Sequence, residues 1–120
     1  MKILVCGSRS FSDYNELEQR LDRIIAPGCS IISGGAVGAD SLAVQYAKKH
    51  NIPYEVVLPK WKVYGRSAGF KRNIEMLNML SQNDLVVAFI VNNSKGSEHT
   101  VTNANLRNIK TIIFNYTKEF

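Results

Sequence analysis

The chain has 120 residues, of which 45% are hydrophobic and 21% are charged. This composition fits one globular domain over residues 1–120 and excludes a disordered or low-complexity chain. The longest apolar run, Leu85 to Val91, is far too short to span a bilayer, and the apolar stretch at the start is too short for a secretory signal. We therefore expect a cytoplasmic protein with no membrane partner.

The net charge of +5 favours an anionic partner, such as a nucleotide, a nucleic acid or another phosphate ester, without choosing among them. Cys6 and Cys29 are expected at opposite ends of parallel strands, beyond the reach of a disulfide. The two histidines, His50 and His99, lie far apart in the sequence, and no spacing typical of metal ligands occurs. We therefore expect no metal site.

Hydrophobic patterning predicts alternating strands and helices. Short apolar runs predict strands at residues 2–6, 29–33, 54–58, 85–91 and 111–115. Apolar residues at helical spacing predict helices at about 14–26, 40–50, 68–80 and 100–107, with irregular loops over 59–67 and 92–99. This order predicts an α/β domain, in which a parallel sheet of about five strands carries helices on both faces.

Several apolar residues are assigned to packing rather than to chemistry. Phe70 is expected on the buried face of the third helix with Ile74 and Leu77, because the three residues are spaced i, i+4 and i+7. Phe11 is expected to anchor its loop on the core. Cys6 is expected to be a small buried hydrophobic residue rather than a nucleophile.

The glycines indicate where a ligand would bind. In an open parallel sheet, ligands bind beyond the carboxyl ends of the strands. Of the eight glycines, seven fall in or beside the loops expected at that edge, and only Gly28 falls at the other edge. Because glycine permits close approach of the backbone, this asymmetry favours a binding site at the carboxyl edge.

The loop over residues 33–40 carries the strongest single motif. Gly34, Gly35 and Gly38 would let backbone N–H groups turn toward an anion, and the following helix would add its dipole. No Gly-Lys-Ser/Thr follows, which excludes a P-loop, and the spacing does not fit the dinucleotide fingerprint. The alternative is a tight turn with Asp40 as the N-cap of the helix. Asp40 is also a candidate acceptor for a ribose hydroxyl.

Two basic residues are candidate phosphate ligands. Arg9 follows Gly7 and Ser8 at the end of the first strand, where the alternative is a solvated surface charge. Arg72 and Asn73 lie near the start of the third helix. A cation there opposes the helix dipole, which favours an external anion or a carboxylate partner.

The remaining candidates lie after the third and fourth strands. The hydroxyl-rich segment before the last helix supplies Ser94, Gly96, Ser97 and Thr100. These residues suit phosphate or ribose oxygens, and the alternative is helix capping by Ser97 or His99. Trp61 or Tyr64 could cover a base by stacking.

These motifs occur in order along nearly the whole chain. They include Gly7-Ser8-Arg9, Ser33-Gly34-Gly35-Ala36-x-Gly38-Ala39-Asp40, Pro59-x-Trp61, Arg72-Asn73 and Ser94-x-Gly96-Ser97-x-x-Thr100. The set resembles the SLOG superfamily, named for the Smf/DprA and LOG proteins, and in particular its small single-domain YspA-like branch. The resemblance implies a Rossmann-like fold that binds a nucleotide or a nucleotide-derived ligand, such as an ADP-ribose-like or NAD-derived molecule, as a sensor, carrier or sequestering protein. It is compatible with a homodimer.

Two branches of the superfamily imply alternatives. The LOG enzymes cleave the N-glycosidic bond of nucleoside 5′-monophosphates, but here Asn73 replaces a lysine of their motif and Thr100 stands at the position of their glutamate. A nucleotide N-glycosidase or a related ribosyl-transferring enzyme would therefore use Glu98 or Asp40 as its carboxylate. The DprA branch implies single-stranded DNA binding. It is less favoured, because the sequence shows no basic-aromatic stripe.

Overall fold

Strands and helices alternate along the chain, as the hydrophobic patterning predicts. The computed structural model describes residues 1–117, so the last three residues of the expected domain lie outside the described part. The strands are β1 (Lys2–Gly7), β2 (Ser30–Ser33), β3 (Tyr54–Val56), β4 (Leu85–Val91) and β5 (Lys110–Tyr116). The helices are α1 (Tyr14–Asp22), α2 (Ala39–Lys49), α3 (Trp61–Tyr64), α4 (Ala68–Asn78) and α5 (Lys95–Leu106), with a 3-10 turn at Gly65–Ser67.

The five strands form one parallel sheet in the order β3-β2-β1-β4-β5. The chain runs outward from β1 to β3 and then crosses to β4 and β5, so the strand order reverses between β1 and β4. The predicted α/β class and the parallel sheet are confirmed, and the arrangement is Rossmann-like. In such sheets the crevice beyond the reversal point is where ligands bind.

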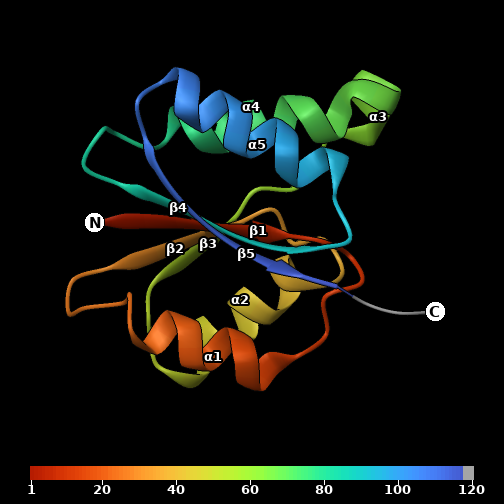
Figure 1. The fold of residues 1–120 in the computed structure, drawn as a ribbon. Helices are drawn as coiled ribbons and strands as arrows, with labels where there is room; N and C mark the ends of the chain where they lie inside the picture. Colours follow the sequence, from red (N-terminus) through yellow and green to blue (C-terminus); the bar gives the residue numbers. More distant parts are fainter. Residues whose placement is uncertain (118–120) are drawn as a thin grey trace.

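Helices cover both faces of the sheet, α1 and α2 on one face and α4 and α5 on the other (Figure 1). On the first face Leu21 packs with Phe89, and on the second Leu77 packs with Leu4. Because both faces are covered, β4 is buried along its whole length. Phe11 is 3% exposed and its ring centroid lies 5.2 Å from that of Phe89, which confirms its predicted anchoring role.

The segment 59–67 differs from the irregular loop that we predicted. It forms α3 followed by the 3-10 turn, and both are held by local backbone bonds, such as those from the N–H groups of Val63 and Tyr64 to the carbonyl of Lys60. Residues 61–67 are all exposed, so no buried apolar face imposes a helical period on their sequence. The patterning therefore gave no signal for this helix.

The start of the last helix also differs from the prediction. α5 begins at Lys95 rather than at Thr100, and Ser94 is its N-cap. The first turn of α5 carries no large apolar residue, so the apolar period begins only at Val101. Two other boundaries shift as well: α1 ends at Asp22, before the expected 26, and β3 ends at Val56 rather than at residue 58.

Candidate functional site

A cavity of about 540 Å³ lies at the reversal point of the strand order. Its walls come from the loops after β1 and β4, from the first turns of α4 and α5, and from Asp40 and Trp61. The candidates that line it are Gly7, Ser8, Arg9, Asp40, Trp61, Arg72, Asn73, Ser94, Gly96, Ser97 and Thr100. The candidates outside its lining are Ser33, Gly34, Gly35, Gly38, Tyr64 and Glu98.

Ser8 joins the two strand ends beneath the cavity. Its backbone N–H donates to the carbonyl of Phe89 at 2.9 Å, and its Oγ accepts from the N–H of Val91 at 2.8 Å. The same Oγ donates to the carbonyl of Val91 at 3.4 Å, and Ser8 is 4% exposed. Although Ser8 lines the cavity, its hydroxyl is engaged in holding β1 against β4 at the floor of the site.

Three arginines line the cavity: Arg9, Arg66 and Arg72. Arg9 and Arg66 are exposed, whereas Arg72 is partly buried. The Arg72 guanidinium donates from Nη1 to the carbonyl of Gly34 at 2.7 Å and from Nε to Oδ1 of Asn73 at 3.1 Å. Burial lowers the pKa of Arg72, and nearby Asp40 opposes that change. The guanidinium stays charged, because arginine remains protonated in proteins.

Asp40 is a buried carboxyl group in the wall of the cavity, only 5% exposed. The prediction that it caps α2 is wrong: the helix starts at Ala39, its N-cap is Gly38, and Asp40 is the second helical residue. The Asp40 carboxylate instead turns back to accept a bond of 3.4 Å from the N–H of Ala36. Burial raises the pKa of Asp40 from 3.8 to about 6. The charges of Arg72 and Arg9 and the bond from Ala36 each lower this pKa, but they do not cancel the effect of burial.

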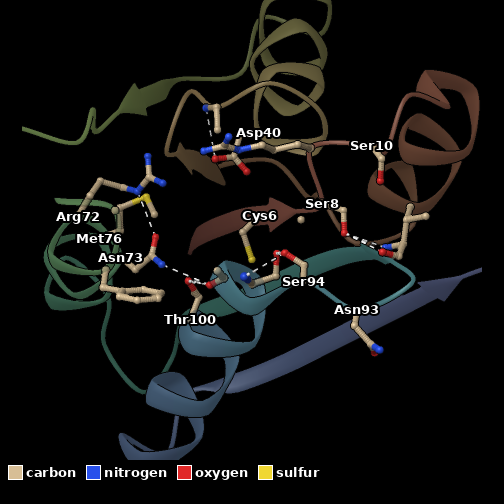
Figure 2. A pocket seen from close by; sticks show the side chains of 18 of the residues that line it. Cys6, Ser8, Ser10, Asp40, Arg72, Asn73, Met76, Asn93, Ser94 and Thr100 are labelled. Atoms are coloured by element: carbon tan, nitrogen blue, oxygen red, sulfur yellow. Dashed lines mark hydrogen bonds between the residues drawn. The ribbon is translucent and has the colours of Figure 1, made fainter. Parts of the chain in front are cut away.

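Side chains from three helices and one helix cap surround the end of β1 (Figure 2). Asp40 comes from α2, Arg72 and Asn73 from α4, and Ser94 and Thr100 from the cap and first turns of α5. Cys6, at the end of β1, lies between them. Burial raises the pKa of the Cys6 thiol well above its usual value, and the nearby Asp40 carboxylate adds to the increase. The thiol is therefore protonated at neutral pH, as expected for a packing residue rather than a nucleophile.

The glycines of the loop 33–40 serve internal packing. A Cβ at Gly34 would lie 2.6 Å from Nη1 of Arg72 and 2.8 Å from Oδ2 of Asp40. Gly38 has φ +92°, and a Cβ there would lie 2.3 Å from the carbonyl oxygen of Ser8. These two glycines therefore allow the loop to pack directly against Arg72, Asp40 and the segment after β1.

The N–H groups of this loop also point inward. The amide of Gly35 donates to Oγ of Ser33, that of Ala36 to Asp40, and that of Ala39 to the carbonyl of Ser8. Ser33, which is fully buried, also donates from its hydroxyl to the carbonyl of Asp40 at 2.9 Å. The N–H groups of Gly35, Ala36 and Ala39 are therefore engaged within the protein, and the loop positions Asp40 and Arg72.

The start of α5 lines the cavity, whereas most of the loop 33–40 does not. The Oγ of Ser94 accepts from the N–H of Ser97 at 3.4 Å, which makes Ser94 the cap that we had assigned to Ser97 or His99. No atom lies within 4 Å of a Cβ built on Gly96, so packing does not require a glycine there. Thr100 donates to the carbonyl of Gly96 at 3.3 Å. A helix start with small residues and an open glycine suits an anionic group.

Asn73 connects α4 to the start of α5. Its Nδ2 donates to the carbonyl of Gly96 at 3.3 Å and lies 3.5 Å from Nδ1 of His99. Its Oδ1 accepts from Arg72, and the residue is 6% exposed. Asn73 thus fixes the position of Arg72 relative to the first turn of α5.

The structure adds residues that the sequence did not suggest. Arg66, Gly69, Phe70, Ser10 and Asn93 also line the cavity. The prediction that Phe70 is a core residue is wrong: it is 47% exposed, although its spacing from Ile74 is helical. Phe70 lies in the first turn of α4, and its ring lines the cavity rather than the core. Trp61, 53% exposed, contacts the cavity close to Gly69.

The two candidate carboxylates are placed differently. Asp40 lines the cavity, whereas Glu98 is exposed and lies outside the lining. Within residues 1–117, no group of three His, Cys, Asp or Glu residues is arranged to hold a metal ion. No helix among these residues is both long enough and apolar enough to cross a membrane.

The domain is Rossmann-like, with a cavity at the reversal point of its sheet. Comparison with known proteins identifies its family. The chain belongs to the YspA, cpYpsA-related SLOG family, whose model matches residues 1–64. It is also similar to the Gene 61 protein of Mycobacterium phage D29, with 32% identity over 123 residues that cover 94% of this chain and 95% of that protein. No solved structure matches.

The family match confirms the resemblance found in the motifs. It covers β1 to α3, which includes Gly7-Ser8-Arg9 and the glycine loop 33–40. Membership of this family suggests a function related to nucleotides.

Proposed function

We propose that the protein binds a nucleotide or a nucleotide-derived ligand in the cavity at the end of β1 and β4, as a sensor, carrier or sequestering protein. The observation that carries this proposal is the convergence of Arg9, Arg66 and Arg72 with the start of α5 around one cavity of about 540 Å³. A cavity of this volume is within the range of small-molecule sites.

The phosphate subsite lies between the arginines and α5. Arg9 and Arg66 are exposed and able to reach an incoming phosphate, and the open backbone at Gly96 allows its oxygens to approach the first turn of α5. Arg72, held by Asn73 and by the carbonyl of Gly34, supplies a fixed positive charge. Asp40 would accept a ribose hydroxyl.

The base subsite lies toward α3 and α4. Trp61 and Phe70 both line the cavity and are about half exposed, at 53% and 47%. Exposed aromatic rings at a cavity mouth offer faces on which a nucleobase can stack. Ligand binding would therefore bury apolar surface that the free protein exposes.

A thermal-shift panel of AMP, ADP, ADP-ribose and NAD tests the proposal. A ligand present at 100 times its Kd stabilises the folded state by about 2.7 kcal/mol, which raises the midpoint of unfolding. Arg9→Ala should reduce the shift. Arg23→Ala should not, because Arg23 is equally exposed but lies at the end of α1, away from the cavity. A folded protein that shows no shift with any of the four compounds would contradict the proposal.

A second candidate function is N-glycosidase activity, and the position of Asp40 favours it. Asp40 is the one acidic residue among the described residues that line the cavity, and its pKa of about 6 lets it donate a proton near neutral pH. In this reaction the C1′–N bond to adenine would break and water would add to C1′ of the ribose. Adenine would leave with a proton supplied by the carboxyl group, and the proton lost by the attacking water would restore that group.

Chromatographic assay for free base tests this activity. AMP, ADP-ribose or NAD incubated with the protein should release its base, and Asp40→Asn should abolish release while Glu98→Gln leaves it unchanged. Substrate that stays intact after long incubation, under conditions in which the ligand is bound, would leave binding as the function and exclude hydrolysis.

A further inference from the structure

A second cavity, of about 570 Å³, adjoins the first. It lies between α3, α4 and the start of α5, and its lining includes Lys60, Tyr64, Lys71, Ile74 and His99. Phe70 lines both cavities, so its ring forms part of the boundary between them. The two cavities therefore meet at Phe70.

Three aromatic rings line this second cavity. The centroids of Phe70 and His99 lie 4.4 Å apart with the ring planes inclined by 37°, and Tyr64 is 44% exposed. Burial lowers the pKa of His99, which keeps its ring uncharged at neutral pH and suited to stacking. Exposed aromatic rings gathered around a hollow suit a flat aromatic group, which would stack on them and remove them from water.

The charges around the second cavity favour an anionic ligand. Lys60 and Lys71 line it with a single carboxylate, Glu75, among its described lining residues. The Lys71 ammonium lies 4.7 Å from the centroid of the Tyr64 ring, which places a cation directly at an aromatic wall. Basic groups beside stacking surfaces are the combination that holds nucleobases joined through phosphate. The sequence did not reveal this combination, because α3 and α4 bring it together only in the fold.

We propose that the ligand is a dinucleotide in which two nucleosides are joined through their 5′ phosphates, with the second base held in the cavity lined by Tyr64, Phe70 and His99. This inference rests on the proposed nucleotide-binding function. The three arginines and the start of α5 then hold the linking phosphates, and each cavity receives one base. A mononucleotide would leave the second set of rings exposed to water.

Calorimetric titration of matched ligands tests this inference. The probes are ADP, two adenosines joined through a 5′,5′ pyrophosphate, and the phosphodiester dinucleotide ApA. The pyrophosphate dinucleotide should bind at least about tenfold more tightly than ADP, because stacking of one base contributes about that factor. Tyr64→Leu, which changes a residue that lines the second cavity and not the first, should remove most of this gain and leave the affinity for ADP unchanged.

Tyr54→Leu is the matched control. Tyr54 is 41% exposed, close to the 44% of Tyr64, but it lies on β3 and lines neither cavity, so the gain should persist. Equal affinities for ADP and the pyrophosphate dinucleotide would overturn the inference while the proposed function stands. Tighter binding of ApA than of the pyrophosphate dinucleotide would overturn it in favour of a nucleic-acid strand. Failure of the wild-type protein to bind any probe would overturn both.

Discussion

Glycines at the carboxyl edge of the sheet are of two physical kinds. Gly38 has a positive φ of +92° and packs against the backbone of Ser8, so the fold requires a residue without a side chain. Gly96 has open space around it, although it lies within the first turn of α5. Packing within the protein therefore does not require a glycine at position 96. A glycine beside a cavity allows a bound group to approach the backbone closely, which is the role that we propose for Gly96.

Replacing each of these glycines by alanine should give opposite effects on stability. Gly38→Ala should lower the free energy of unfolding by about 2 kcal/mol or more, because it combines strained backbone with a steric clash. Gly96→Ala should raise it by about 0.5–1 kcal/mol, because alanine favours the helix, and should weaken ADP binding by crowding the phosphate subsite. Urea denaturation and calorimetry measure the two properties. Unchanged ADP affinity in Gly96→Ala would place the phosphate elsewhere.

The buried carboxyl of Asp40 makes stability depend on pH. Its pKa is higher in the folded protein, about 6, than the ordinary 3.8, so the folded state holds a proton in that interval that the unfolded state has lost. The contribution of Asp40 is therefore favourable at low pH and is lost as the pH rises through about 6. Other carboxyls act in the opposite sense: the Lys49 and His50 side chains lower the pKa of the partly buried Glu18 to about 2.

Comparison with Asp40→Asn isolates this effect. The free energy of unfolding of the variant minus that of the wild type should increase by about 3 kcal/mol between pH 3 and pH 8, following from the rise of the pKa from 3.8 to about 6. Urea titrations across this range measure the difference. The attraction between the Asp40 carboxylate and Arg72 is already contained in this pKa, and the remaining difference between a neutral carboxyl group and asparagine does not vary with pH. A difference that stays constant or decreases with pH would contradict the buried, protonated carboxyl.

Among the helices and strands, the start of α5 shapes one wall of the cavity. Ser94 has an extended backbone, with φ −153° and ψ 113°, and its side chain caps the helix by accepting from the N–H of Ser97. Its hydroxyl also donates to Oγ of Ser97 at 3.1 Å. The bond from Asn73 to the carbonyl of Gly96 then ties this first turn to α4. The subsite that we propose for phosphate is therefore shaped by contacts between two helices rather than by one loop.

Two substitutions at Ser94 separate capping from ligand binding. Ser94→Ala should lower stability by about 1 kcal/mol, because the cap is lost. Ser94→Asp should retain stability, since aspartate caps equally well, but should strongly weaken ADP binding, because it places a negative charge at the phosphate subsite. Thermal denaturation and calorimetry of both variants check this. Tight ADP binding by Ser94→Asp would show that the phosphate does not lie at α5.

Over the whole molecule, the sequence predicted the architecture better than the details of the site. Burial leaves a strong signal in the hydrophobic pattern of a sequence. This signal appears in the apolar runs of β1 and β4 and in the helical spacing of the buried residues Leu17 and Leu21. Exposed α3 has no such signal, and it was missed. Phe70 shows the opposite case. Its helical spacing predicts burial, but its side chain is 47% exposed and lines the cavity.

The cavity itself depends on contacts between distant segments. Arg9 and Arg72 were recognised as candidates because both lie where strands and helices meet at the carboxyl edge. The roles of Gly34 and Asp40 were not recognised, since nothing local in the sequence shows that Arg72 donates to the carbonyl of Gly34 beside the Asp40 carboxylate. The glycine motif lies at this edge, where Gly34 leaves room for Arg72 and Asp40 and Gly38 leaves room for the backbone after β1.

The most direct test of a phosphate-binding cavity between β1, β4 and the start of α5 is an NMR titration of the ¹⁵N-labelled protein with ADP. The largest shifts should occur in the amides of residues 7–10 and 94–100 and in the side-chain Nε–H of Arg72, with little change in α1 or β3. Shifts confined to α1 and β3, or none at saturating ADP, would contradict the account.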